Sequence, residues 1–245
     1  MRVRKGNIFR KTNRRRLPMT DIIYGGALGL LAALAFNRIA VFQIKKRTDE
    51  TSKIEAVKNT AAIVIWVLLS GILFAAVFAI IKDTPTRIEA VAYISIAISI
   101  GVVDLDIKKI PNSSVLALLL IRTGFLIYAI ATGAPLKETL IPSLAGLAGG
   151  FILYQLPMFF GIPIGTGDVK YSAAIGYCLG AFGYLQAALI MAAGLVIYLI
   201  YLVATKKGSL KTAVPMGPYL SLGVVFTVLF PMFGELSQTV FSSLF

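Results

Sequence analysis

The sequence predicts an all-α protein that crosses a membrane as a polytopic bundle of about eight transmembrane helices. Of its 245 residues 58% are hydrophobic, the mean hydropathy is +0.84, and only 14% are charged. Soluble domains average about 45–50% apolar and about a quarter charged residues. One soluble core of this size cannot bury such an excess of apolar side chains, so a bilayer is needed to cover it.

Eight apolar runs define the predicted helices, because a spanning helix needs about 20 mostly apolar residues. The short loops between them favour one compact bundle over two domains. The border between the sixth and seventh runs is arbitrary at this stage. The runs are Ile22–Phe42, Thr60–Ile81, Ile88–Val103, Val115–Ala131, Thr139–Phe160, Tyr171–Tyr184, Leu185–Thr205 and Val214–Phe233.

The distribution of basic residues predicts which loops face the cytoplasm. The net charge is +13, from 24 Lys and Arg against 11 Asp and Glu. With eight helices, the loops that follow the first, third, fifth and seventh share one side and hold most of the loop lysines and arginines, whereas the other loops hold only Lys82, Arg87 and Lys137. Short loops rich in basic residues stay in the cytoplasm, next to anionic lipid. The charge therefore indicates a bilayer partner and not nucleic acid.

Three segments make up the predicted organisation: a basic tail (1–17), a first membrane helix with a short cytoplasmic loop (18–59), and a membrane-embedded core (60–245). The tail conflicts with the topology, because alternation places it outside while its eight basic residues should hold it inside. A re-entrant or differently paired first run would remove the conflict. So would a true start at Met19.

The residue types available restrict the chemistry. The chain has no histidine and one cysteine, Cys178. These counts exclude histidine-dependent serine or cysteine triads, a disulfide framework and the usual zinc sites. No metal or cofactor is predicted, and a hydrolase built from this chain has to use carboxylates.

Aspartates at helix ends are the candidates for that chemistry. Asp104 and Asp106 end the third run, and Asp168 directly precedes the sixth, so alternation places them at the same membrane face. Two close carboxyls share a proton and titrate as a pair. The ionised one takes a proton from water, and the protonated one hydrogen-bonds the scissile carbonyl and then protonates the leaving amine. The alternative is that each aspartate is solvated or pairs with a nearby lysine: Lys108, Lys109 or Lys170.

The surrounding segments resemble the type IV prepilin peptidase family of GxGD-type membrane aspartyl proteases. Asp104 is followed six residues later by Ile110-Pro111-Asn112, which is similar to the first catalytic motif of the family. Gly165-Thr-Gly-Asp-Val-Lys170 is similar to its GxGD-x-K signature, and Pro215-Met-Gly-Pro-Tyr-Leu220 resembles a third segment. The resemblance extends over about residues 88–233.

The resemblance implies a function and a pair of catalytic residues. Asp104 and Asp168 match the two catalytic aspartates, and Asp106 is the alternative that replaces or assists one of them. The implied reaction is removal of the basic leader from prepilins or pseudopilins, as in type IV pilus or type II secretion systems. The implied location is the cytoplasmic face of the inner membrane. The substrate has a short basic leader, a cleavage site, and then a hydrophobic helix.

Five further residues are predicted to contact substrate: Gly165, Gly167, Lys170, Gly217 and Pro218. The glycines near Asp168 would let a substrate backbone approach closely. Lys170 is equally well explained as an interface anchor, and Pro218 as a helix start.

One part of the family pattern is missing. The loop Gln43–Asn59 lacks the CxxC pairs that many members carry in their first cytoplasmic loop. The sequence therefore predicts peptidase activity and leaves N-methyl transfer open.

Two other functions remain as alternatives. A proton-coupled transporter would place its aspartates near the bilayer midplane, and a silent assembly scaffold would keep the fold without the reaction.

Other features of the apolar runs have structural interpretations. The small-residue patterns Gly146–Gly150 and Gly176–Gly180 predict close helix packing. Arg122, inside the fourth run, is predicted to snorkel toward the headgroups, with a buried partner as the alternative.

Overall fold

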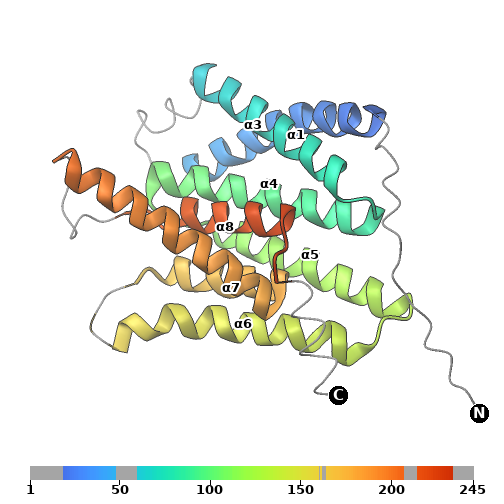
Figure 1. The fold of residues 1–245 in the computed structure, drawn as a ribbon. Helices are drawn as coiled ribbons and strands as arrows, with labels where there is room; N and C mark the ends of the chain where they lie inside the picture. Colours follow the sequence, from blue (N-terminus) through green and yellow to red (C-terminus); the bar gives the residue numbers. More distant parts are fainter. Residues whose placement is uncertain (1–18, 48–59, 160, 162–163, 207–213, 234–245) are drawn as a thin grey trace, which may run out of the picture.

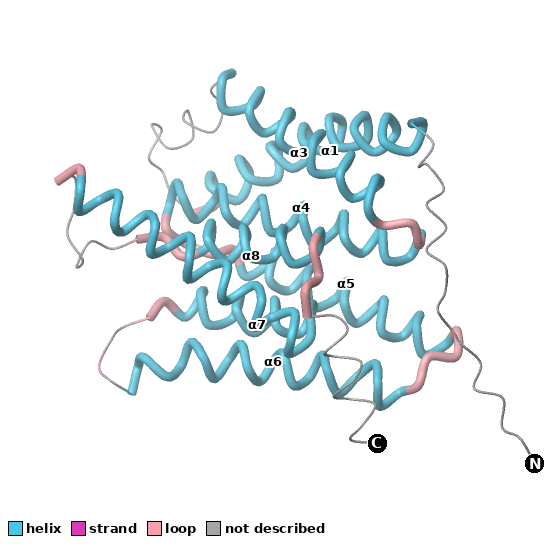
Figure 2. Tube along the Cα trace, in the orientation of Figure 1, coloured by secondary structure: helices cyan, strands magenta, loops and turns pink. Residues whose placement is uncertain are grey.

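A computed structural model describes residues 19–47, 60–159, 161, 164–206 and 214–233. Helices and loops account for this part of the chain, as Figure 2 shows. The helices are α1 (Met19–Lys45), α3 (Thr60–Ile80), α4 (Thr84–Ile107), α5 (Asn112–Ala131), α6 (Leu136–Phe159), α7 (Thr166–Ala204) and α8 (Gly217–Leu229). The prediction of an all-α membrane bundle is confirmed.

Six of the described helices, α1 and α3 to α7, are long and apolar enough to cross a membrane. The predicted number of eight spans is not confirmed. α8 has only 13 residues, which gives about 20 Å against a hydrocarbon core of about 30 Å.

A turn at Gly180 divides α7 into two arms, 166–179 and 181–204. Gly180 has φ 72° and ψ 174°, a conformation open almost only to glycine. The Ser172 and Tyr184 hydroxyls meet at 2.6 Å, although twelve residues of straight helix would separate them by about 18 Å. The arms therefore fold back on one another. Two helices were predicted here with their border at Tyr184 and Leu185, four residues too late.

The helices form layers in Figure 1. α1 packs beside α3 in one layer, α4 and α8 lie in the middle, and α7 packs against α6. The main core cluster joins Ile100 of α4, Tyr171 and Ile175 of α7, and Leu220 and Val224 of α8. Many large apolar side chains on the outer helix faces are exposed instead, as expected where lipid is the solvent.

Glycines set the close contact of α6 with α7. A Cβ on Gly146 would collide with the Gly176 carbonyl oxygen, and a Cβ on Gly176 would collide with that of Gly146. A Cβ on Gly150 would collide with the Ser172 carbonyl oxygen. The predicted packing role of these small residues is confirmed.

Local sequence signals mark both ends of α4, the helix that carries Asp104. At its start the Asp83 carboxylate caps the helix by accepting bonds from the Thr86 N–H and hydroxyl. These bonds hold the pKa of Asp83 below its usual range. At its end Lys108 is left-handed (φ 51°), and its N–H donates to the Asp104 carbonyl. Pro111 then precedes α5 directly, so α4 and α5 are joined by a short turn.

The chain alternates direction through the bundle, so the helix ends fall into two groups (Figure 1). We call the end with the 108–111 turn and the start of α7 the aspartate end. The end with the 81–83 turn and Gly180 is the opposite end. The predicted grouping of the loops is therefore confirmed for the described residues. The basic tail (1–17) and most of the 43–59 loop lie outside them.

Candidate active site

Asp104 is buried near the end of α4, in contact with the start of α8. Asp104 is only 4% exposed. The alternative that it is a solvated aspartate at a helix end is therefore wrong. The Gly217 N–H donates to Asp104 Oδ2 at 2.9 Å. The first N–H groups of a helix lack partners within it and carry partial positive charge. The start of α8 therefore provides a fixed donor for this carboxylate.

Asp168 lies in the first turn of α7, which begins after Gly165. It is half-buried, and its carboxyl interacts electrostatically with that of Asp104. Two aspartates that are 64 positions apart in the sequence thus lie at the same end of the bundle, near enough for their carboxyls to interact electrostatically. The structure brings together the two residues that the sequence singled out.

Three of the glycines predicted to contact substrate lie where a side chain would crowd a neighbouring part of the site. A Cβ on Gly217 would lie 2.8 Å from Asp104 Oδ2, and one on Gly165 would lie 2.7 Å from Asp168 Oδ2. A Cβ on Gly167 would lie 3.2 Å from that of Ile110, in the 108–111 turn. Each glycine leaves room for an element of the site. Their contact with a substrate stays a prediction.

The remaining predicted site residues occupy the same end. Pro218 is in the first turn of α8, which confirms its interpretation as a helix start. Lys170 is exposed, four residues after the start of α7, and neither of its two predicted roles is tested. Asp106 is half-buried, two residues after Asp104 and therefore about 200° around the helix axis from it.

One hydrogen-bonded chain joins three helices below the two aspartates. The Tyr171 hydroxyl lies 2.9 Å from Ser221 Oγ, which donates to the Ala97 carbonyl oxygen at 2.6 Å. Since the one Ser221 proton is used on Ala97, Tyr171 is the donor to Ser221. We call this chain the Tyr171 relay.

The residues of the Tyr171 relay lie on the same helix faces as the site residues. Tyr171 is three residues after Asp168 on α7, and Ser221 is four residues after Gly217 on α8. Ala97 is seven residues before Asp104 on α4. Residues three, four or seven apart lie on one face of a helix. The relay thus joins the same three helix faces, one to two turns deeper in the bundle.

A second chain of hydroxyl hydrogen bonds joins α7 to α6. Ser172 Oγ donates to the Gly150 carbonyl oxygen at 3.0 Å and accepts from the Tyr184 hydroxyl at 2.6 Å. This Tyr184 relay joins α6 to the two arms of α7, and its hydrogen bonds include no residue of α4 or α8.

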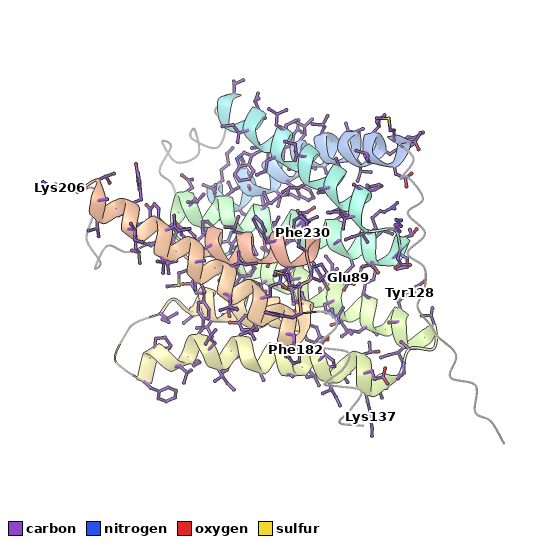
Figure 3. All side chains as sticks on the ribbon, in the orientation of Figure 1. Glu89, Tyr128, Lys137, Phe182, Lys206 and Phe230 are labelled. Atoms are coloured by element: carbon purple, nitrogen blue, oxygen red, sulfur yellow. The ribbon has the colours of Figure 1, made fainter. Side chains whose placement is uncertain are left out.

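Arg122 does not snorkel; the prediction was wrong. Its Nη1 donates to Glu89 Oε1 at 2.8 Å, and its Nη2 donates to Ser143 Oγ at 2.8 Å. Tyr93 also donates to Glu89. These residues tie α4, α5 and α6 together (Glu89 is labelled in Figure 3). A long basic side chain can reach either the headgroups or a buried acid, and here Glu89 lies within reach.

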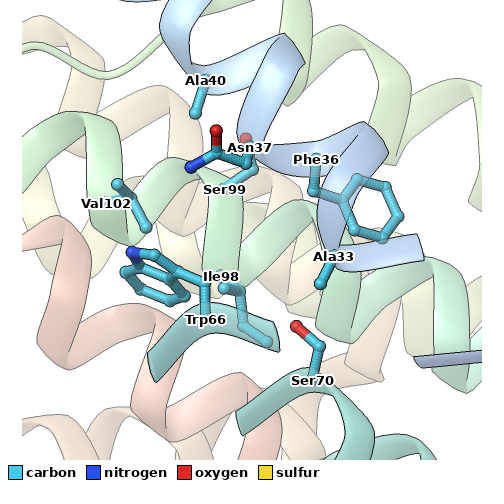
Figure 4. Close-up of a pocket in the computed structure, with 9 residues that line it drawn as sticks. All are labelled: Ala33, Phe36, Asn37, Ala40, Trp66, Ser70, Ile98, Ser99 and Val102. Carbon is cyan, nitrogen blue, oxygen red and sulfur yellow. The ribbon is translucent and has the colours of Figure 1, made fainter. Parts of the chain in front are cut away.

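A small cavity between α1, α3 and α4 has no predicted site residue in its lining (Figure 4). It measures about 20 Å³ and is lined in part by Trp66, Ser70 and Ser99. That volume holds about one water molecule.

Known proteins match the part of the chain that carries both aspartates. Residues 91–205 match the sequence profile of the type IV leader peptidase family. This part of the chain is similar to that family. The third resembling segment, Pro215–Leu220, lies beyond the matched residues, so its resemblance stays a prediction.

Similar proteins are named as enzymes that process prepilin leaders. The chain is 38% identical over 137 residues to the type 4 prepilin-like proteins leader peptide-processing enzyme of Escherichia coli O78:H11 (strain H10407 / ETEC), covering 54% of this chain and 47% of that protein. It is 32% identical over 168 residues to the prepilin leader peptidase/N-methyltransferase of Burkholderia pseudomallei (strain 1026b), covering 66% and 53%. The chain thus spans about half the length of these relatives. No solved structure matches.

Sequence reasoning missed Tyr171, Ser221 and Glu89. Spacing was the available signal for the first two, because each lies one turn from a predicted site residue. Glu89 was overlooked as an ionisable group inside an apolar run, although such groups are costly in a membrane.

Proposed function

We propose that this chain is a membrane aspartyl endopeptidase that removes the basic leader of type IV prepilins or pseudopilins. The observation that carries the proposal is the position of Asp104 and Asp168 at one end of the bundle, where their carboxyls interact electrostatically and the Gly217 N–H holds Asp104. The family of residues 91–205 supports leader processing. The aspartyl mechanism rests on the two carboxyls.

In the proposed mechanism the pair is active when it carries one proton. Gly217 holds Oδ2 of Asp104, and we assign the other oxygen to the attacking water. The ionised carboxylate takes a proton from water while the water oxygen forms a bond to the scissile carbonyl carbon. The protonated carboxyl donates to the carbonyl oxygen. As the C–N bond breaks, the amine takes a proton and the pair returns to one shared proton.

The position of the pair favours a peptidase over the proton-coupled transporter. Asp104 lies three residues before the end of α4, and Asp168 lies two residues after the start of α7. Transporter sites usually lie near the bilayer midplane, where helices are interrupted. A carboxyl pair at a helix end lies close to the membrane surface, on the side where a basic leader stays.

We place the aspartate end at the cytoplasmic face of the inner membrane. At this end Lys45 and Lys46 lie at the end of α1, Lys108 and Lys109 follow α4, and Lys206 follows α7. The described cations at the opposite end are Lys82, Arg87 and Lys137. The positive-inside rule supports this orientation. It also suits a basic leader that has not crossed the membrane.

Methyl transfer is not part of the proposal. The name of the Burkholderia relative includes that activity, but this chain spans about half of that protein, and its 43–59 loop has no cysteine.

The test is leader removal from a candidate prepilin that is co-expressed with the protein, followed by gel shift and N-terminal sequencing. Asp104→Asn and Asp168→Asn keep the side-chain shape without the ionisable proton. We expect each to abolish cleavage while the protein still reaches the membrane, and Asp106→Asn is the matched control that keeps it. Cleavage that survives either of the first two changes contradicts the pair. A wild type that cleaves none of several leaders favours the scaffold or the transporter.

A further inference from the structure

An apolar groove runs along the outside of the bundle from the level of Asp104. It has a volume of about 270 Å³ and lies between α3, α4 and α8. Its lining includes Trp66 and Leu69 of α3, Leu105 of α4, and Leu222 and Phe226 of α8. α3 and α8 touch only slightly, so α4 forms the floor between them.

The groove begins at the level of Asp104 along α4. Leu105 directly follows Asp104, and Pro218, which also lines the groove, directly follows Gly217. Gly217 is the donor to Asp104. From this point the groove follows α8 as far as Phe226, eight residues or about 12 Å along a helix. That length corresponds to about two helical turns.

We propose that this groove binds the first turns of the substrate's hydrophobic helix, so that its cleavage site lies at Asp104 and Asp168. The inference rests on the proposed function. In such a substrate the hydrophobic helix directly follows the cleavage site. An extended residue spans at most about 3.5 Å, so the helix has to enter the membrane beside the aspartates. This groove is apolar and begins at the level of Asp104.

The groove also suits a helix better than a polar ligand. Leu69, Leu222 and Phe226 are each between 39% and 46% exposed, so they present apolar surface on the outside of the described protein. A helix binds such a groove through apolar side chains spaced three and four residues apart. In a bilayer the affinity comes from close packing, because lipid covers apolar surface equally well.

The first experiment compares two substrates with the purified full-length protein in lipid nanodiscs. One is a prepilin with its hydrophobic helix, and the other is a peptide with the same leader and cleavage site but no helix. Leu222→Trp fills the groove. Leu116→Trp is the control, because Leu116 is 55% exposed on α5, outside the groove, at a similar distance from the aspartate end.

We expect Leu222→Trp to raise KM for the prepilin about tenfold while kcat/KM for the short peptide stays within about twofold. Leu116→Trp should change neither. An unchanged KM for the prepilin would mean that the groove holds only lipid. An equal loss on both substrates would mean that the tryptophan disturbs the aspartates, and it would also overturn the proposal. Failure of the wild type on both substrates would contradict the proposed function itself.

A cross-linking measurement gives a readout that needs no turnover. In an Asp168→Asn background, Leu222→Cys is oxidised in the presence of prepilins that carry single cysteines along the first two turns of the helix. We expect disulfides at positions three or four residues apart. Leu116→Cys should give none. Equal cross-linking of both positions, or of neither, rejects the groove.

Discussion

Removal of the Tyr171 hydroxyl separates positioning of the aspartates from stability of the fold. Tyr171→Phe deletes one oxygen and leaves Ser221 bonded to the Ala97 carbonyl. Ser221 Oγ, 5% exposed as a residue, then lacks its donor. An unsatisfied buried acceptor costs about 1–3 kcal/mol. We therefore expect the free energy of unfolding to fall by that amount.

Tyr184→Phe is the matched control. It deletes the same group from the Tyr184 relay and leaves Ser172 bonded to the Gly150 carbonyl, so it should cost about the same 1–3 kcal/mol. Of the two relays, only the Tyr171 relay joins the helix faces that carry Asp168, Gly217 and Asp104. A shift of about 1 Å between reacting groups can cost about 100-fold in rate. We expect kcat to fall about 10- to 100-fold in Tyr171→Phe and by less than about threefold in Tyr184→Phe.

The assay is cleavage of a prepilin in detergent as a function of pH, beside unfolding of the same samples. A wider separation of the carboxyls weakens their mutual repulsion, so the singly protonated pair exists over a narrower pH range. The activity profile of Tyr171→Phe should narrow accordingly, while that of Tyr184→Phe should not. Ser221→Ala and Tyr171→Phe should combine non-additively, because they remove one shared bond. Equal losses of activity in the two tyrosine variants would refute the positioning role.

Two further predictions concern the N-terminal half of α4. Arg122→Met leaves the part-buried Glu89 without its counter-charge and should lower the free energy of unfolding by about 1–3 kcal/mol; adding Glu89→Gln should restore much of it, and no recovery would contradict the pair. The pKa of Asp83 is lower in the folded protein than in the unfolded chain, where it is about 3.9. The cap therefore stabilises α4 fully at pH values above the unfolded pKa. This stabilisation is lost as the pH falls through the lower, folded pKa. Hydrogen exchange at the first turn of α4 should therefore rise in acid for wild type more than for Asp83→Asn, which caps without titrating; equal acid responses would exclude this cap as the cause.

The membrane class and the two aspartates could be predicted because both are local properties of the sequence. An apolar run of sufficient length forms a helix in lipid whatever its neighbours are, since its backbone groups have to be satisfied internally. The spacing of Asp104 to Ile110-Pro111-Asn112 and the Gly165–Lys170 segment are equally local. Alternation of the chain then placed both aspartates at one end.

Contacts between distant segments were decided by the tertiary structure alone. The turn at Gly180 lies inside a continuous apolar stretch, so hydropathy did not mark it; a glycine-only backbone conformation did. Arg122 found Glu89 33 positions away, and the Gly217 N–H found Asp104 113 positions away. A sequence records which groups need a partner in an apolar medium. Which partner lies within hydrogen-bond distance depends on how the helices pack.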